Sequence, residues 1–307
     1  MSDAPSEETL LEELRPAAFA IAYRMLGSVA EAEDVVQEAL LRFHTALERG
    51  ERIESPRAYI ATVATRLSID VLRSARMRRE AYVGEWLPEP LVSDTSAEPA
   101  RQAEMADSLS LAFLVLLESL SPEQRAAFLL HDVFDYGYGE VAEIVGKSED
   151  NARQLAARAR RHVDEQKPRF EASREQREEL ADRFFAAAQE GDVASLEALL
   201  ADDVVLHGDG GGKVPALARA LFGAKRVART LRAWFRQGAK VPDGEVRRVD
   251  VNGQPGAVLT AGGGVVAVMA LDIADGRVQG IRSIVNPDKL HHVGEVADWV
   301  SLLRGQS

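Results

Sequence analysis

The chain has 307 residues, of which 46% are hydrophobic and 28% are charged, so its length and composition suit two or three small domains with packed cores. No apolar run approaches the roughly eighteen residues of a membrane-spanning helix, and the acidic N-terminus lacks the basic and apolar regions of a secretory signal. Cysteine is absent, which excludes disulfide bonds and thiolate zinc sites. The six histidines do not have the spacing of a metal site. We therefore expect a cytoplasmic protein with no metal site and no cofactor.

The net charge of −12 argues against a protein that holds DNA alone, because non-specific affinity for DNA comes from neutralising its phosphates. Arginines are nevertheless concentrated in two short stretches, residues 66–79 and 153–161. Two local basic patches on an acidic chain indicate DNA contact made together with a larger partner. Two solvated helix faces would give the same pattern, so the surrounding motifs have to decide.

Residues 8–80 are expected to form a first, helical domain. Apolar residues recur at helical spacing until Gly27 ends the first helix, and Ser28 then begins the second as an N-cap, with Glu31 completing a capping box. Ser55, followed by a proline at the first helical position, begins the third. The second and third helices are predicted over about 29–48 and 57–79.

A linker is expected over residues 81–104, where prolines and acidic residues interrupt the helical pattern. A second helical domain follows over residues 105–166, and Ser121 with Gln124 marks a clear helix start within it. Gly146 separates the last two helices of this domain. The predicted helices run over about 122–134, 138–145 and 149–166.

The last part of the chain changes character. Two helices come first, then a strand, a further helix and four runs of alternating apolar residues separated by Asn252-Gly253, Gly262–Gly264 and Asp275-Gly276, pairs that favour hairpin turns. This order predicts an α+β domain over residues 175–290, with a helical layer on a curved antiparallel sheet, and a C-terminal tail over 291–307. The helices are expected at about 175–190, 193–200 and 223–237, and the strands at about 204–207, 246–251, 257–260, 265–273 and 278–285.

The segment 138–161 has the pattern of a helix-turn-helix. Apolar residues of the first helix can pack against a stripe of small residues on the second, which leaves a polar face for base edges and phosphates. A purely structural helical hairpin would have the same spacing. The side chains on the polar face are Asn151, Arg153, Gln154, Arg158 and Arg161.

The N-terminal segments decide between these readings. AYRMLGSVAEAEDVVQEALLRF and SPRAYIATVATRLSIDVLRSARMRR resemble region 2 of the extracytoplasmic-function (ECF) sigma factors of bacterial RNA polymerase, and the helix-turn-helix with its lead-in LSPEQRAAFLL resembles their region 4. The resemblance covers residues 8–166. It implies a factor that binds core RNA polymerase, directs promoter recognition at the −10 and −35 elements and starts transcription.

For polymerase binding, the resemblance points to the helix of DVVQEALLRF as the contact with the clamp helices of the largest subunit. The implied residues are Asp34, Gln37 and Glu38. Without the resemblance, Asp34 and Glu38 are an acidic pair on the solvated face of an amphipathic helix.

For DNA, the resemblance assigns the arginine-rich helix to the −10 element, where the duplex melts and an unpaired base is captured. A tyrosine can stack on a base, arginines can neutralise phosphates and an aspartate can accept from a base edge. Tyr59 is equally compatible with a place in the core. The residues assigned to the −10 element are Tyr59, Arg66, Asp70, Arg73 and Arg76, and those assigned to the −35 element are the five side chains of the helix-turn-helix.

Beyond residue 175 the chain resembles the SnoaL-like cone-shaped α+β fold of small-ligand binders, cyclases and isomerases. Three motifs are similar to those of the ECF group that carries this fused domain: WLPEP in the linker, DGGGK after the first strand and NPDKL after the last. DGGGK is not a phosphate-binding P-loop, because its glycine spacing is wrong and Val214 stands where Ser or Thr is needed.

We expect the three motifs to meet, so that the fused domain packs on the linker and sets the relative position of the two sigma domains. An exposed tryptophan in the linker would be a poor choice without a partner. The alternative is a freely tethered domain, with WLPEP inserted toward the polymerase active centre. The expected interface consists of Trp86, Leu87, Pro88, Asp209, Gly210, Gly211, Gly212, Lys213, Asn286, Pro287 and Asp288.

Two other functions are compatible with parts of the sequence. A free-standing helix-turn-helix regulator leaves the N-terminal motifs unexplained. A SnoaL-like enzyme with a DNA-binding appendage would need catalytic residues, and His207 beside Asp209 is the candidate acid–base pair at the mouth of the cone. No second catalytic residue accompanies this pair, so we expect no enzyme, although a small molecule could bind in the cone.

Overall fold

The computed structural model describes residues 7–80, 82–93, 109–166, 173–241 and 243–304. The chain divides into two compact units, which are described separately. The first contains residues 1–80 and 116–167, and the second contains residues 81–115 and 168–307. The division therefore assigns the linker and the start of α5 (Leu111–Leu117) to the C-terminal unit.

The first unit is entirely helical among its described residues. Ser28 caps the second helix by accepting a hydrogen bond from the Glu31 N–H, and Ser121 and Gln124 form the expected capping box. The helix expected over 122–134 ends in a π-helical turn at Leu129–Val133. The α-helices are α1 (Glu7–Leu26), α2 (Val29–Glu48), α3 (Pro56–Glu80), α6 (Pro122–Phe128), α7 (Tyr138–Val145) and α8 (Glu149–Gln166).

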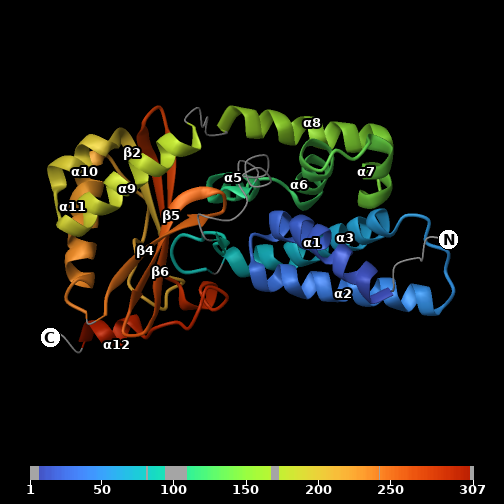
Figure 1. Ribbon diagram of the computed structural model, residues 1–307. Coiled ribbons are helices and arrows are strands. Elements are labelled where there is room, and N and C mark those ends of the chain that lie inside the picture. Colours follow the sequence, from blue (N-terminus) through green and yellow to red (C-terminus); the bar gives the residue numbers. More distant parts are fainter. Residues whose placement is uncertain (1–6, 81, 94–108, 167–172, 242, 305–307) are drawn as a thin grey trace. The chain divides into compact units, whose positions relative to one another are not determined.

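The second unit is an α+β domain, as expected. Its seven-stranded sheet has the order β1-β4-β5-β6-β7-β2-β3. Helices α9 (Arg174–Glu190), α10 (Val193–Leu199) and α11 (Ala224–Gly238) lie along one side of the sheet (Figure 1). The strands are β1 (Val92–Ser93), β2 (Leu200–Asp209), β3 (Leu221–Phe222), β4 (Glu245–Val251), β5 (Gln254–Ala261), β6 (Gly264–Ala274) and β7 (Arg277–Ile284).

The sheet is not wholly antiparallel, because β2 pairs with β7 in parallel. These two strands are separated in the chain by α11 and the β4–β6 meander, which is long enough for the crossover that a parallel pair needs. The tight turns are as predicted: Asn252 and Gly253 have φ of 55° and 76°, and Asp275 and Gly276 have φ of 52° and 68°. Positive φ at both turn residues suits the right-handed twist of a hairpin.

Both faces of the sheet are buried, each in its own core. Met269, Leu271 and Ile281 face the helical layer and pack with the apolar sides of α9, α10 and α11. Val268 and Ile284, from the alternate positions, face the other way and pack with Leu87 of the linker, Leu111 and Leu290. Because side chains alternate along a strand, neighbouring positions such as Val268 and Met269 lie in different cores.

The segment after the last strand is docked rather than free. His292 Nε2 lies 2.7 Å from the carbonyl oxygen of Pro90 in the linker, and Val265 pairs with Val296 in a parallel bridge on β6. The short helix α12 (Trp299–Arg304) follows, and Trp299 packs with Val266 and Ala267 of β6. The sequence pattern did not predict this because the segment has no regular periodicity.

The linker also differs from the expectation of an irregular connection. Its residues Val92 and Ser93 form β1, which extends the sheet beyond β4. Within the described ranges, no helix is both long and apolar enough to cross a membrane.

Candidate functional site

Helices α7 and α8 form a helix-turn-helix with a small apolar core. Gly146 ends α7 with a φ of 67°, and Ala152 and Ala156 of α8 pack against Val141 and Ile144 of α7. The five side chains expected to contact the −35 element, Asn151, Arg153, Gln154, Arg158 and Arg161, are all exposed. The division into a buried seat and an exposed polar face is the one that a recognition helix needs.

Arg153 is held by two neighbours in the free chain. Its guanidinium donates to Glu149 Oε1 at 2.8 Å and lies 4.9 Å from the centre of the Tyr138 ring. An exposed ion pair of this kind stabilises by at most about 1 kcal/mol, so a phosphate or a base edge can displace Glu149. Arg153 is therefore positioned without being sequestered.

The three residues expected to bind polymerase share one face of α2. Asp34 and Gln37 are exposed, and Glu38 accepts from Arg42 Nε at 2.7 Å. Leu41 lies on the same face, one turn further on, and is 58% exposed. The sequence interpretation missed Leu41, whose signal is an apolar residue at the centre of an otherwise polar stripe.

The residues expected at the −10 element have partners in the first unit. Tyr59 packs edge-on against Phe43 with 5.6 Å between ring centres and is half-buried, which favours a structural role for its ring. Arg66 donates to the backbone oxygens of Glu143 and Ile144, at 2.8 and 3.0 Å. These two carbonyls belong to α7, so the free chain joins the −10 segment to the helix-turn-helix.

Arg73 makes a second such link. It donates to Glu123 at 2.6 Å and to Asp70 at 3.4 Å, and the hydrogen bond with Glu123 raises the pKa of Arg73. The side chain of Arg76 lies outside the described residues. Arginines expected on DNA are thus engaged with the second helical domain in the free chain.

Arg125 of α6 makes a further, buried contact between the two helical domains. Its side chain is 3% exposed and donates to the oxygens of Met25 and Leu117, both at 2.6 Å, and to Glu118 at 2.9 Å. Burial lowers the pKa of Arg125 to about 9. A buried guanidinium needs these acceptors, and one of them is a carbonyl at the end of α1.

The C-terminal unit brings the three motifs WLPEP, DGGGK and NPDKL together around one buried carboxylate. Asp209 is fully buried at the end of β2 and accepts from Tyr82 Oη at 2.5 Å, from Leu87 N–H at 2.9 Å and from Lys289 Nζ at 2.7 Å. Lys289 Nζ also donates to the Leu87 carbonyl and lies 4.3 Å from the centre of the Trp86 ring. The expected interface named neither Tyr82 nor Lys289, although Lys289 stands within NPDKL.

The glycines of DGGGK permit close approach of neighbouring chain segments. A Cβ on Gly210 would lie 2.4 Å from the Val214 oxygen, and one on Gly211 would lie 2.3 Å from Asn286 Nδ2. Gly212, with a φ of 71°, meets Val83 of the linker in the same way. Gly210 therefore permits the tight turn of the loop itself, while Gly211 and Gly212 let the loop pack against NPDKL and the linker.

One further ion pair and a hydrogen bond to an aromatic hydroxyl complete this junction. Asn286 Nδ2 donates to Tyr82 Oη at 2.9 Å, and burial raises the pKa of the Tyr82 phenol. Lys213 pairs with Asp288 at the surface, where the two side chains are 54% and 55% exposed. Leu87 and Pro88 are buried, and Pro287 begins a short 3₁₀ turn.

Asn252 hydrogen-bonds to the chain on both sides of the segment between residues 91 and 109. Its side chain accepts from Leu91 N–H at 2.8 Å and donates to the Leu109 carbonyl at 2.9 Å. One amide in the β4–β5 turn therefore fixes chain positions 91 and 109 close together. Sequence reasoning identified Asn252 only as a turn residue.

His207 and Asp209 do not form a pair at the mouth of the cone. Both lie on the face of the sheet that packs against the linker, while Gly208 between them lines the cavity on the other face. His207 Nδ1 is 2.6 Å from Glu85 Oε1 of the linker. The alternation of a strand explains the difference, because adjacent even and odd positions point to opposite sides.

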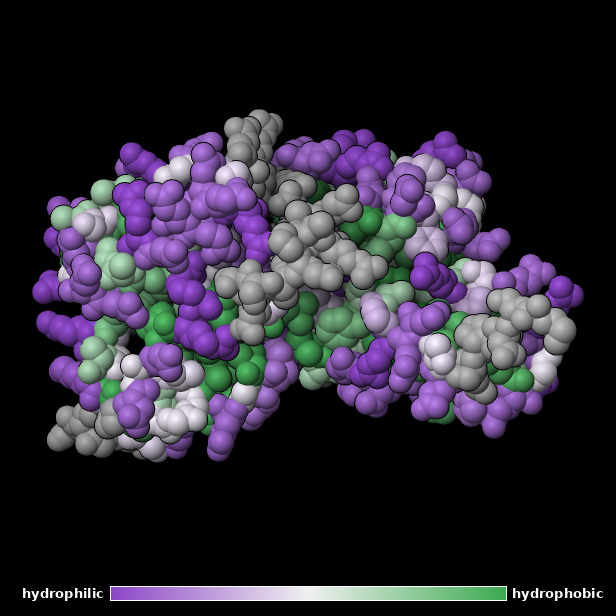
Figure 2. Space-filling model, in the orientation of Figure 1, coloured by the Kyte–Doolittle hydropathy of each residue, from purple (hydrophilic) through white to green (hydrophobic). Residues whose placement is uncertain are grey.

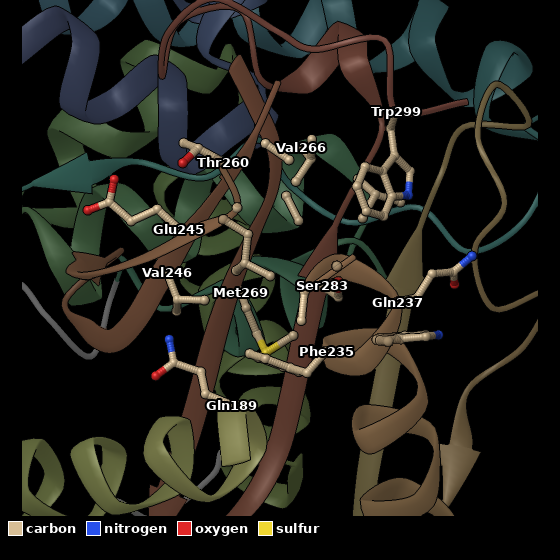
Figure 3. Close-up of a pocket in the computed structure, with 18 of the residues that line it drawn as sticks. Gln189, Phe235, Gln237, Glu245, Val246, Thr260, Val266, Met269, Ser283 and Trp299 are labelled. Carbon is tan, nitrogen blue, oxygen red and sulfur yellow. The ribbon is translucent and has the colours of Figure 1, made fainter. Parts of the chain in front are cut away.

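The cone itself contains a cavity of about 450 Å³ between the sheet and the helical layer. Figure 3 shows Met269 and Ser283 of the sheet, Phe235 of α11 and Trp299 of the C-terminal segment around it. The lining is mainly apolar, and Glu245 is its one charged residue within the described chain. Uncharged polar side chains at the wall are Gln189, Gln237, Thr260 and Ser283.

Helical domains that carry an arginine-rich helix and a helix-turn-helix, joined to a cone-shaped α+β domain, define a class of transcription factor with a fused C-terminal domain. Three family models match the chain in that order: Sigma-70 region 2 over residues 10–78, Sigma-70 region 4 over residues 110–163 and a SnoaL-like domain over residues 181–288.

The chain belongs to the ECF RNA polymerase sigma factors. It is 39% identical over 292 residues to the ECF sigma factor SigJ of Mycobacterium tuberculosis, with 92% of this chain and 93% of SigJ covered. It is 32% identical to the probable ECF sigma factor SigI of the same organism, covering 88% and 90% of the two chains. The crystal structure of SigJ matches with a TM-score of 0.74 over 91% of this chain and 96% of that one.

Replacing Asp209 by asparagine should loosen the linker. The change keeps the shape but leaves Lys289 as a buried charge without its counter-ion, a loss of about 3–5 kcal/mol for buried pairs. Hydrogen exchange measured by mass spectrometry should increase across residues 82–91, at the Leu87 amide above all.

Lys213→Gln is the matched control, because it breaks a lysine–aspartate pair between the same two motifs at the surface. Such a pair contributes about 1 kcal/mol or less, so exchange in the linker should not change. Equal exchange in the parent chain and in Asp209→Asn would show that the buried pair does not hold the linker.

Proposed function

We propose that the chain binds core RNA polymerase through α2, recognises the −10 and −35 promoter elements through α3 and α8, and is regulated by its fused SnoaL-like domain. The observation that supports this most strongly is the near full-length similarity to ECF sigma factors together with the exposed polar face of α8. We place its activity in the cytoplasm, where a bacterial polymerase works. The acidic net charge fits this division of labour, since polymerase supplies much of the affinity for DNA and the factor supplies specificity.

The free chain holds its two DNA-reading segments together. Arg66 hydrogen-bonds to α7 and Arg73 to Glu123, so the −10 segment is engaged with the domain that reads the −35 element. The two elements lie about 25 base pairs apart, which is about 85 Å along B-DNA. Both cannot be read while these contacts persist, and we infer that binding to polymerase and promoter separates the two domains.

The linker sets whether this separation is possible. About 30 residues join α3 to α5, and a fully extended chain of that length spans at most about 100 Å. That reach only just exceeds the distance between the promoter elements, so a linker pinned at Asp209 and Asn252 is too short. We infer that the fused domain inhibits by holding the linker and that release of the linker permits initiation.

We propose that the cone is a regulatory binding site rather than a catalytic one. His207 and Asp209 face the linker and not the cavity, which removes the acid–base pair that the enzymatic alternative requires. The cavity has aromatic walls, a few hydrogen-bonding groups and no lysine or arginine in its described lining. It therefore suits a neutral, mainly apolar molecule with one or two polar groups.

Association with polymerase should depend on the exposed face of α2. The double change Asp34→Ala/Gln37→Ala, and separately Leu41→Ala, should weaken binding of the chain to core polymerase in a pull-down, with the fold intact by circular dichroism. Ala substitutions on a polar helix face leave the core unchanged. Leu10→Ala, on α1, is the control, and parent-like binding by both α2 variants would show that another surface contacts polymerase.

Reading of the −35 element should depend on α8. Arg158→Ala should cost about 1–3 kcal/mol of holoenzyme binding at one promoter position if the side chain reads a base edge, and should weaken all promoters alike if it contacts phosphate. Binding to promoter variants at fixed salt distinguishes the two. A −35 preference that survives single substitutions of all five exposed side chains would assign recognition elsewhere.

Regulation by the linker gives a transcription test with the variants already described. Asp209→Asn should produce more run-off transcript with core polymerase than the parent chain, because the linker is released, and Lys213→Gln should match the parent. Less transcript from Asp209→Asn at unchanged polymerase binding would mean that the docked linker is the active form.

Ligand binding can be probed with a neutral apolar dye. Prodan should bind the full chain and bind more weakly to Ser283→Phe, whose ring would fill the cavity, while anionic anilinonaphthalene sulfonate should bind poorly beside Glu245. Circular dichroism controls for folding of the variant. Equal prodan binding by the parent and by Ser283→Phe would locate the dye outside the cone.

A further inference from the structure

Helix α11 carries a basic stripe that no part of the sigma-factor mechanism uses. Lys225, Arg229, Arg232 and Arg236 follow one another at intervals of three or four residues and are all exposed. Residues at these intervals lie on one side of a helix, and the stripe extends over about 16 Å. The opposite side of α11 buries Val227, Ala228, Leu231 and Phe235 in the core. Figure 2 shows strongly hydrophilic residues projecting from this edge of the domain.

The stripe stands in a segment without acidic residues. Between Asp209 and Asp243 the chain has lysines and arginines but no aspartate or glutamate, although 49 of its 307 residues are acidic. The local sign is thus opposite to the net charge of −12. Such a concentration of one sign creates a local positive potential on a negative protein.

Some surface arginines on other helices of the chain pair with an acidic residue of the same helix. Arg42 pairs with Glu38 on α2, and Arg153 pairs with Glu149 on α8, each one turn apart. No ion pair of Lys225, Arg229, Arg232 or Arg236 occurs among the described residues. Like charges one turn apart destabilise a helix, so the stripe lowers the stability of α11 in the free domain. A negatively charged partner would remove this repulsion.

The N-terminal end of α11 adds to the same potential. Its first turn contains Lys225 and Arg226 and no acidic residue, and Gly223 at the N-cap supplies no side-chain acceptor. The unpaired N–H groups and the helix dipole at this end favour an anion, and the two cations strengthen that preference. The N-terminal end of α11 therefore adds to the positive charge of the stripe.

We propose that α11 contacts the phosphate backbone of promoter DNA in the initiation complex, as a third DNA-binding element beside α3 and α8. The inference rests on the proposed function, because it places the chain on promoter DNA with polymerase. A linear array of cations about 16 Å long matches the axial rise of about five base pairs. The contact carries affinity and no base sequence, because phosphates are the same at every position.

The test is the salt dependence of promoter binding by the holoenzyme assembled with the full chain. Arg229→Gln/Arg232→Gln should reduce the slope of log affinity against log salt by about two, since each phosphate contact contributes about 0.9. Binding at about 0.1 M salt should weaken about tenfold or more, equally for every −35 sequence. Circular dichroism establishes that the variant is folded.

Two controls separate charge position from net charge. Arg229→Lys/Arg232→Lys keeps the cations and should keep the parent slope. Arg247→Gln removes an exposed charge from β4, toward the other edge of the sheet from β2 and β3, and should also keep the slope. Binding to core polymerase and preference for the −35 sequence are measured for the parent chain as well. If the parent chain has neither property, the proposed function itself fails. If both are retained and the Gln variant has the parent slope, or if that variant loses affinity for core polymerase in the absence of DNA, α11 does not bind the promoter.

Discussion

The buried ion pair between Asp209 and Lys289 organises the C-terminal unit. The carboxylate at the end of β2 and the ammonium group after β7 have side chains that are 0% and 7% exposed, so each requires the other. Their remaining hydrogen-bonding capacity is directed at the linker, through Tyr82 and the backbone N–H and C=O of Leu87. The docked linker thus supplies hydrogen-bond partners to both members of the pair. Without the linker, the two buried charges would lack these partners.

The same sheet separates two tasks by the alternation of its strands. Gly208 and Ser283 face a cavity in the cone, while their neighbours Asp209 and Ile284 face the linker. Side chains on the two faces share one backbone, so the cavity and the linker contacts are built on the same strands. Under the proposed function, a ligand in the cavity would act on the linker through these strands, without a separate inhibitory protein.

In the helical unit, hydrogen bonds from arginines to backbone carbonyls hold the two sigma domains together. Arg66 binds carbonyls of α7, and Arg125 binds the carbonyl of Met25 at the end of α1. Arg66 belongs to the segment expected to contact promoter DNA, so under the proposed function DNA would compete with the α7 carbonyls for its guanidinium. A carbonyl acceptor gives up an arginine to a phosphate more readily than a buried carboxylate would, because phosphate adds a full charge.

The sequence by itself determined the helices, the hairpin turns and the family, because capping residues, positive-φ turn pairs and apolar periodicity are local signals. It also singled out WLPEP, DGGGK and NPDKL, with Asp209 among the interface residues, but not Tyr82 and Lys289, which look like ordinary surface residues until the chain folds. The tertiary structure alone decided that His207 and Asp209 face away from the cone, that Asn252 joins positions 91 and 109, and that residues after 291 dock on β6. These depend on which face a strand presents and on contacts between residues that are far apart in the chain, neither of which a local pattern encodes.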